Sequence, residues 1–390
     1  MPRRCGPRVH QRTLCARPPP GRCAARTLRE AARDHPDPCL TSIGTDRARW
    51  EAPMAGGGLG LMPDAISIAR VVREATGESP GEVRPLGRGM TCVAWAVEAG
   101  RREVAVVVEI PREGRDAVHQ DDPANLAARH AIHLALREAD PDAPVPEPIA
   151  CSATVERDPL GGRWSWQVLS LASGEELDAT RHPEAVRDLG RLLATLHALP
   201  AEGRGLLEDR ADAIRGRATT PTDGIVSRWG EQWPFDGRPL LAHPIARNAP
   251  DLVGVLGDLR EPLLRYTDPG AQVGVCHTDL FGAHTLVRDG RLAALMDFGD
   301  AAIVPVAFDL ASFAYYHAAH RGWDALHTLL EGYEPRRVMR DVREAEAYQL
   351  LVVLALQKVR KHTLSGDTAR LPEAIAVLRA ALPRAVRRDA

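Results

Sequence analysis

Polar residues that could carry out chemistry are concentrated in one stretch of the chain. His277, Asp279 and His284 precede an Asp289-Gly290 dipeptide, and Asp297 follows it. Asp-Gly between two apolar runs is typical of a two-residue hairpin turn, because both central positions must accept a positive φ. A carboxylate and an imidazole that meet on a hairpin can bind one divalent cation, while a further unligated carboxylate acts on a substrate. That combination suits phosphoryl transfer.

The turn also predicts which residues face each other across the hairpin. Counting outward from it pairs Leu286 with Ala293 and His284 with Leu295, so Asp297 lies diagonally across from His284 on the same face. Diagonal neighbours in an antiparallel pair are roughly 7 to 8 Å apart. We therefore expect His284 and Asp297 to be the metal ligands.

The same residues resemble those of a known family. His277-Thr278-Asp279 with His284, followed by Met296-Asp297-Phe298-Gly299, resembles the aminoglycoside phosphotransferases, small-molecule kinases with a protein-kinase-like fold. His at 284, where most members have Asn, is most similar to the macrolide phosphotransferase branch. The resemblance extends over residues 64–385 and is most specific at 275–300. It implies an α+β fold with a small antiparallel β N-lobe and a larger, mostly helical C-lobe.

The resemblance implies a role for each of these residues. Asp279 would be the catalytic base for a hydroxyl nucleophile, and His277 would hold the catalytic loop through backbone contacts. Mg²⁺ prefers hard oxygen ligands, so Asp297 is the better ligand and His284 the unusual one, and Mn²⁺ could replace Mg²⁺. ATP or GTP would be the phosphate donor. The acceptor would be a hydroxylated small molecule, and His284 favours a macrolide or aminoglycoside antibiotic.

Candidates for nucleotide binding lie in the N-terminal half. Gly87, Gly89 and Thr91 form a turn between two β runs, where backbone N–H groups could approach phosphate. Where the kinase fold has a strand-three Lys paired with a helix Glu, the resemblance places Glu109 and His130. The charges of this pair are therefore reversed.

A carboxylate at position 109 cannot bind phosphate. We therefore expect Arg112, together with Arg88 and the metal, to hold the nucleotide phosphates. Two alternatives remain open at this point. One is a metal-dependent hydrolase in which the polar residues at 277–297 all bind one metal, and the other is a catalytically impaired nucleotide-binding relative.

Composition limits the remaining function classes. The chain has 390 residues, 44% of them apolar, and a net charge of −2 without a basic region, so we expect no nucleic-acid partner. Its longest apolar run near the C-terminus, 350–356, is shorter than the about 20 residues that span a bilayer. Of 50 Lys and Arg residues only Lys358 and Lys361 are lysines, which excludes a Walker A loop. We expect a cytoplasmic monomer or weak dimer without membrane contact, with its cysteines as buried thiols.

The pattern along the chain predicts three regions. Residues 1–62 are an Arg- and Pro-rich disordered tail and linker, 63–171 form the nucleotide-binding N-lobe, and 172–390 form the catalytic and substrate-binding C-lobe. Asp309, after the hairpin, could cap the N-terminus of a helix or bond the catalytic loop, and the resemblance favours the second role. His197 is expected to be structural. His317, His320 and His327 are expected to line solvent or the substrate cleft.

The predicted strands are 83–86, 92–97, 104–110, 149–155 and 164–171, and the predicted helices are 65–74, 122–139, 186–199, 251–266, 343–361 and 372–382.

Overall fold

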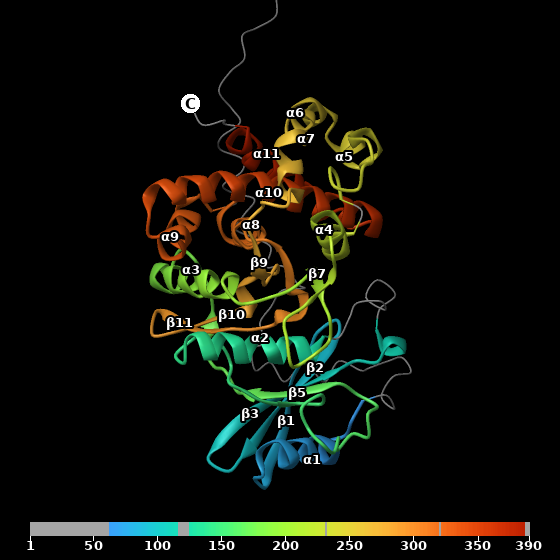
Figure 1. Cartoon of the computed structure of the whole chain (residues 1–390), viewed down its shortest axis with the longest axis vertical. Helices are drawn as coiled ribbons and strands as arrows, with labels where there is room; N and C mark the ends of the chain where they lie inside the picture. Colours follow the sequence, from blue (N-terminus) through green and yellow to red (C-terminus); the bar gives the residue numbers. More distant parts are fainter. Residues whose placement is uncertain (1–61, 116–124, 231, 320, 387–390) are drawn as a thin grey trace, which may run out of the picture. The chain divides into compact units, whose positions relative to one another are not determined.

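The computed structural model describes residues 62–115, 125–230, 232–319 and 321–386. The predictions for residues 1–61, for 122–124 and for His320 lie outside these ranges. The fold is α+β, as predicted: an antiparallel sheet comes first, and most of the later chain is helical (Figure 1).

The first sheet has five antiparallel strands in the order β1-β2-β3-β5-β4. Its central strand buries Val104, Val106 and Val108 on one face, as period-two alternation requires. Helix α1 (Ala65–Thr76) contacts this sheet and begins at Asp64, whose side chain accepts a hydrogen bond from Ser67 N at 2.8 Å. The strands are β1 (Pro80–Arg88), β2 (Cys92–Ala99), β3 (Arg102–Glu109), β4 (Pro148–Cys151) and β5 (Trp166–Ser170).

Helix α2 (Leu126–Ala139) packs against strands β4 and β5 (Figure 1). Leu126 and Leu136 are buried, but Leu134 is 45% exposed and does not belong to the buried apolar face. At 3.6 residues per turn, two positions apart are about 200° apart, so Leu134 points away from the side on which Leu136 is buried.

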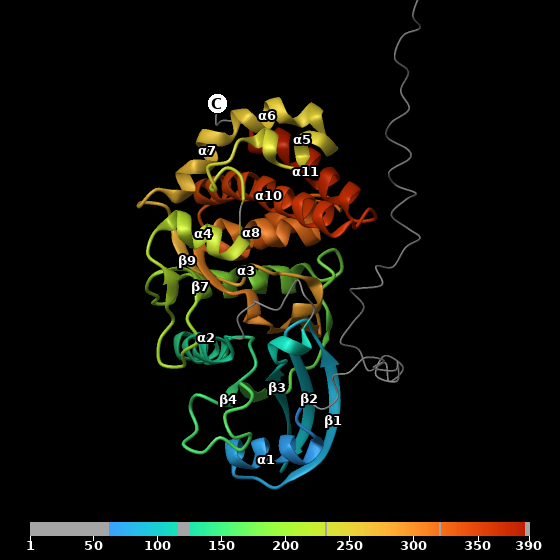
Figure 2. The ribbon, with the colours of Figure 1, turned by 90° about the vertical axis from the view of Figure 1, so that its right-hand side faces the viewer.

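The later part of the chain is built from helices around a long central one. Helix α10 (Arg337–Ser365) packs against α11 (Leu371–Ala385) and against α8 (Ala307–Phe313) (Figure 2). Helix α3 (Pro183–His197) packs against α9 (Asp324–Tyr333) (Figure 1). Among the described residues, no helix is both long and apolar enough to cross a membrane.

The helix expected at 251–266 is present but interrupted. The chain there forms only short helical segments, among them α6 (Val253–Asp258) and α7 (Arg260–Leu264). Pro262 is the third residue of α7. It has no N–H to donate to the carbonyl group of Asp258, the last residue of α6, and its ring clashes with that group, which accounts for the break between the two helices. The remaining helices of this part are α4 (Pro221–Trp229) and α5 (Ile245–Asn248).

Two small sheets carry the candidate site. One has the order β11-β10-β6 and the other the order β8-β7-β12-β9. Asp289 and Gly290, between β10 and β11, have φ of 53° and 73°, and Arg288 pairs with Arg291, so the predicted hairpin turn is confirmed. The strands are β6 (Glu175–Glu176), β7 (Arg204–Leu207), β8 (Gly216–Ala218), β9 (Val273–Cys276), β10 (Thr285–Arg288), β11 (Arg291–Leu295) and β12 (Ala302–Pro305).

The pairing predicted further from this turn is wrong by one residue. The ladder contains a β-bulge, which places two residues of one strand opposite one of the other. Leu286 therefore pairs with Ala294, and His284 O accepts a hydrogen bond from Met296 N at 2.8 Å, each partner one residue later than predicted. Asp297 follows Met296 directly and still comes beside His284.

Three buried histidines are expected to make the stability of the fold depend on pH. Burial lowers the pKa of His133, His243 and His317 to about 4, so each is neutral in the folded protein. Between pH 6.5 and 4 the unfolded chain binds more protons, so stability is lost as the pH falls through this window, by up to about 3 kcal/mol per group. Chemical unfolding at pH 7.5, 6 and 5 measures the loss, and His317→Gln should make it smaller. Equal losses in both proteins would contradict this cause.

Candidate active site

A buried carboxylate holds the loop that follows β9. Asp309, in α8, is fully buried, and its Oδ2 and Oδ1 accept hydrogen bonds from His277 N at 2.8 Å and Thr278 N at 2.6 Å. His197 Nε2 donates to the same carboxylate at 3.1 Å, and its Nδ1 accepts from Tyr333 Oη at 2.8 Å. Asp309 therefore bonds the catalytic loop, as expected, and His197 is structural.

The side chain of His277 fixes the loop from inside. Its Nε2 donates to Met296 O at 2.7 Å, and its Nδ1 accepts from Asp279 N at 3.3 Å. Burial lowers the pKa of His277, which favours this neutral form. The Phe298 ring, fully buried, lies between the rings of His277 and His133, with centroid distances of 4.9 and 5.0 Å. The loop, the segment after β11 and helix α2 are thus packed together.

His284 lies between the two carboxylates that the sequence singled out. Its Nδ1 is 2.9 Å from Asp279 O and 3.6 Å from Asp279 Oδ2, and its Nε2 is 3.6 Å from Asp297 Oδ2. Burial opposes protonation, but the carboxylates of Asp297 and Asp279 outweigh it and raise the pKa of His284. The three side chains are therefore coupled.

This arrangement fits a divalent cation at His284 and Asp297. With Nδ1 directed at a backbone carbonyl, Nε2 of His284 is the atom that faces Asp297. A separation of 3.6 Å is close to that of two ligands on a cation with bonds of about 2.0 to 2.2 Å. The Asp297 side chain is 50% exposed, which leaves room for the waters that Mg²⁺ retains.

Arg129, in α2, holds Asp297 from the other side. Its guanidinium donates to Asp297 Oδ1 at 3.3 Å and to Asn125 Oδ1 at 3.1 Å, and its side chain is only 9% exposed. Partial removal from water would raise the pKa of the Asp297 carboxyl, but Arg129 and the neighbouring imidazoles lower it below its ordinary value. The sequence pattern pointed to the next residue along the helix, His130, and suggested Arg129 only as a possible screen for the charge of Glu109, so the contact of Arg129 with Asp297 was not predicted.

The expected pairing of Glu109 with His130 is wrong. Glu109 forms an ion pair with Arg115, whose side chain is fully buried and whose Nε also donates to Ile110 O at 2.7 Å. Arg115 reaches Glu109 because the short turn η3 (Arg112–Gly114) folds the chain back beside the end of β3. His130 is buried, burial alone lowers its pKa, and its Nδ1 has no hydrogen-bond partner among the described residues.

The other residues expected to bind nucleotide lie at one end of the first sheet. Gly87 pairs with Ala94 across β1 and β2, and Gly89 N donates to Cys92 O at 2.8 Å. Gly89 has no positive φ, and a Cβ there would meet only Cys92 O at an ordinary 3.6 Å. The described fold therefore does not itself require glycine at 89. Thr91 O accepts from Ile110 N at 2.7 Å, and Arg112 is exposed in η3.

Three histidines were expected to line solvent or the substrate cleft, and for His317 this prediction is wrong. It is buried, its Nε2 donates to Leu280 O at 3.1 Å, and its ring stacks on Phe313 with centroids 4.7 Å apart. It therefore supports the chain just after the catalytic loop. His327 is exposed, as expected, and lies 3.0 Å from Glu344.

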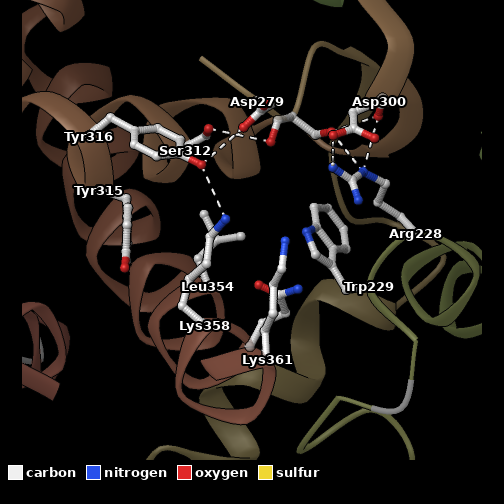
Figure 3. Close-up of a pocket in the computed structure, with 12 residues that line it drawn as sticks. Arg228, Trp229, Asp279, Asp300, Ser312, Tyr315, Tyr316, Leu354, Lys358 and Lys361 are labelled. Atoms are coloured by element: carbon white, nitrogen blue, oxygen red, sulfur yellow. Dashed lines mark hydrogen bonds and ion pairs between the residues drawn. The ribbon is translucent and has the colours of Figure 1, made fainter. Parts of the chain in front are cut away.

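A cavity of about 90 Å³ opens beside Asp279 (Figure 3). Tyr316 Oη donates to Asp279 Oδ1 at 3.0 Å, and Lys358 Nζ donates to Tyr316 Oη at 3.1 Å. On the opposite wall, Arg228 Nε donates to Thr278 Oγ1 at 2.8 Å. Trp229, Tyr315 and Lys361 also line the cavity. Sequence reasoning did not connect these helical residues with Asp279.

The sequence matches the model of a family described as the phosphotransferase enzyme family over residues 82–348. This span is more than half of the chain. The chain belongs to this family. The prediction of a phosphotransferase related to the aminoglycoside enzymes is thereby confirmed. No curated protein sequence matches the chain.

Solved structures show the fold of this phosphotransferase. A thermostable mutant of aminoglycoside phosphotransferase APH(4)-Ia, in ternary complex with AMP-PNP and hygromycin B, matches over 83% of this chain and 100% of that chain, with a TM-score of 0.55 and 15% identity. A candidate fructosamine-3-kinase from Thermobifida fusca YX-ER1 matches over 81% of this chain and 100% of that chain, with a TM-score of 0.51 and 18% identity. At these identities the likeness establishes the kinase-like fold alone.

Proposed function

We propose that this phosphotransferase moves the γ-phosphoryl group of ATP or GTP to a hydroxyl group of a small molecule. The observation that carries the proposal is the position of Asp279, which has the acceptor-sized cavity on one side and the His284–Asp297 pair on the other. A base between an acceptor site and a metal site is what in-line phosphoryl transfer requires. The nucleotide of the APH(4)-Ia complex supports ATP as one donor.

In this mechanism Asp279 orients the acceptor hydroxyl and takes its proton. Tyr316 Oη already donates a hydrogen bond to Oδ1 of Asp279, so Oδ2 of Asp279 is the oxygen available to the substrate. As the hydroxyl oxygen bonds to the γ-phosphorus, its proton moves to Asp279, and the bond from that phosphorus to the bridging oxygen of the nucleoside diphosphate breaks. Asp297 and His284 would hold Mg²⁺ or Mn²⁺, which supplies positive charge to the phosphates. Arg129 keeps Asp297 ionised and in place.

A hydrolase that uses one metal bound by all four polar residues is less well supported. Both ring nitrogens of His277 are engaged, with Met296 O and with Asp279 N, so this side chain has no lone pair to offer a metal. Three groups remain, and two of them, Asp297 and His284, suffice for a kinase metal site. A hydrolase would need no nucleotide, so nucleotide binding separates the two functions.

Nucleotide binding should depend on Arg112 and not on Glu109. Arg112→Ala should weaken the binding of MgATP or MgGTP by roughly 1 to 3 kcal/mol, the cost of a charge-assisted hydrogen bond. Glu109→Ala should leave affinity unchanged or improve it, because a carboxylate near the phosphates is removed and its partner Arg115 keeps its charge. Isothermal calorimetry with Mg²⁺ or Mn²⁺ measures both changes.

The parent protein is the control for this experiment. If it binds neither nucleotide with either metal, the kinase function fails, and an inert relative that keeps the fold becomes the better account. If Arg112→Ala binds normally, the phosphates are held elsewhere. The melting temperature of Arg112→Ala should match that of the parent, since Arg112 is exposed. That of Glu109→Ala should be lower, because the buried Arg115 side chain loses its ion-pair partner.

A macrolide or aminoglycoside acceptor stays a prediction from the sequence. Hygromycin B in the APH(4)-Ia complex supports an antibiotic acceptor only by analogy of fold. The charges around the cavity of this chain bear on the question more directly.

A further inference from the structure

The two lysines of this chain both line the cavity beside Asp279. Of 50 Lys and Arg residues, only Lys358 and Lys361 are lysines. They are three residues apart on α10, and residues at this spacing lie on one face of a helix. Leu354, four residues before Lys358, lines the cavity too, so one face of α10 forms its wall (Figure 3).

The cavity has an excess of positive charge. Three cationic side chains, those of Arg228, Lys358 and Lys361, face the carboxylates of Asp279 and Asp300. Arg228 is neutralised locally, because its guanidinium lies 3.0 Å from Asp300 Oδ2. Among the residues that the structure describes, neither lysine has such a carboxylate partner.

Lys358 and Lys361 are held without a counter-ion. Lys358 Nζ donates to Tyr316 Oη, a neutral group, and it forms no ion pair with any residue that the structure describes. Lys361 is exposed and makes neither a hydrogen bond nor an ion pair with the described part of the chain. Burial lowers the pKa of Lys358; Asp279 opposes this, while Lys361 and Arg228 lower it further. An anion placed between the two ammonium groups would relieve this repulsion.

The walls and the size of the cavity restrict the ligand further. The Trp229 ring is fixed by stacking on Phe308, with centroids 3.9 Å apart, and Tyr315 forms a second flat wall. The volume of the cavity is about 90 Å³. Sites for drug-sized ligands have volumes of about 300 to 1,000 Å³. A polycationic aminoglycoside would meet like charges here, and a macrolide would find little space.

Resting on the proposed function, we infer that the acceptor is a small hydroxylated compound that carries an oxyanion, bound by Lys358 and Lys361 while Asp279 faces its hydroxyl group. An ammonium group binds carboxylate or phosphate oxygens as a point charge with three donors. Lys358 also positions Tyr316, whereas Lys361 has no other partner, so Lys361 is the residue that tests the inference.

The test compares acceptors that differ only in charge. Gluconate, sorbitol and 1-amino-1-deoxysorbitol share one polyol chain with an anionic, neutral or cationic end, and glycerate, glycerol and 3-aminopropane-1,2-diol form a shorter set. Sorbitol 6-phosphate tests phosphate against carboxylate, and hygromycin B and erythromycin represent the antibiotics. Phosphorylated products are measured by mass spectrometry and kcat/KM by nucleotide consumption. We expect at least a tenfold preference for the oxyanion in a set.

Charge variants of Lys361 then assign the preference to the cavity. Lys361→Gln should lower kcat/KM for the anionic acceptor about tenfold or more and leave the neutral polyol unchanged, and Lys361→Glu should shift the preference toward the amine. Arg337→Gln is the matched control: it removes one positive charge from the same helix 24 residues away, about 36 Å along its axis.

Two results would overturn the inference. One is phosphorylation of an aminoglycoside, a macrolide or an amino polyol with higher kcat/KM than every oxyanion tested. The other is a nucleotide-loaded protein that neither binds nor phosphorylates any of the oxyanions in calorimetry and turnover. A failure of the proposed function is distinguished from both, because the parent protein would then fail to bind ATP and GTP before any acceptor is added.

Discussion

Replacing Asp279 with Asn is expected to lower kcat by about 10² to 10⁴ while the affinity for nucleotide changes little. The amide cannot take up the acceptor's proton, and a base contributes in the transition state rather than in the complex with nucleotide. The fold should survive, because Asn is isosteric and its carbonyl oxygen can still accept the hydrogen bond from Tyr316 Oη. Steady-state kinetics gives kcat, and calorimetry gives the nucleotide affinity.

Asp289→Asn is the matched control for this substitution. It makes the same chemical change at the turn of the same hairpin, where Asn accepts a positive φ as readily as Asp. Turnover of this variant should equal that of the parent protein. If Asp279→Asn also turns over normally, another group takes the proton, and the assignment of the base is wrong.

The sequence predicted the parts of the site whose geometry is local. His284 and Asp297 are connected by one hairpin, and its Asp289-Gly290 turn fixes the fold of the connection whatever surrounds it. The β-bulge changed the register by one residue, yet the two ligands still meet. A bulge arises from how a strand packs against its neighbours, so a turn signal alone cannot show it.

The residues that the sequence did not assign to the site come from distant helices. Tyr316, Lys358 and Arg228 are separated from Asp279 by 37, 79 and 51 positions. Only the packing of α4, α10 and the π-helical segment η9 (Ala314–Ala318), which follows α8, brings them together. A signal was present in the composition: the chain is rich in Arg, and its two lysines are three residues apart on an amphipathic helix. The predicted helix was right, but no pattern shows which cavity its polar residues face.

Arg129 and His130 show the limit of motif spacing. Adjacent residues on a helix point about 100° apart, so a shift of one position decides which side chain reaches Asp297. The same holds for Glu109, whose partner Arg115 lies six residues along the chain and not on the helix. The residue types in the sequence indicated where the nucleotide and metal sites lie. Which side chains contact each other there depends on how the helix and the strands pack.

Replacing Asp309 with Ala should lower the free energy of unfolding by about 3 to 5 kcal/mol and abolish turnover. Removing one partner from a buried charged network costs this much, because the remaining groups stay buried without hydrogen bonds. Here the groups left behind are His277 N, Thr278 N and His197 Nε2. The first two belong to the catalytic loop, so Asp279 would lose its position as well.

The Asp309→Asn variant keeps the size of the side chain but removes its charge and one of its two acceptor oxygens, so it tests which of these holds the loop. Both carboxylate oxygens accept from N–H donors, so the NH₂ group of an amide must face a donor whichever way it is turned. The Asn variant should therefore lose nearly as much stability as the Ala variant, although the two side chains Asp and Asn have the same size. Urea unfolding followed by circular dichroism measures both losses, and Asp324→Asn, at the exposed first turn of α9, should change stability by less than about 0.5 kcal/mol. An Asp309→Asn protein as stable and active as the parent would show that the carboxylate's two acceptors are not what holds the loop.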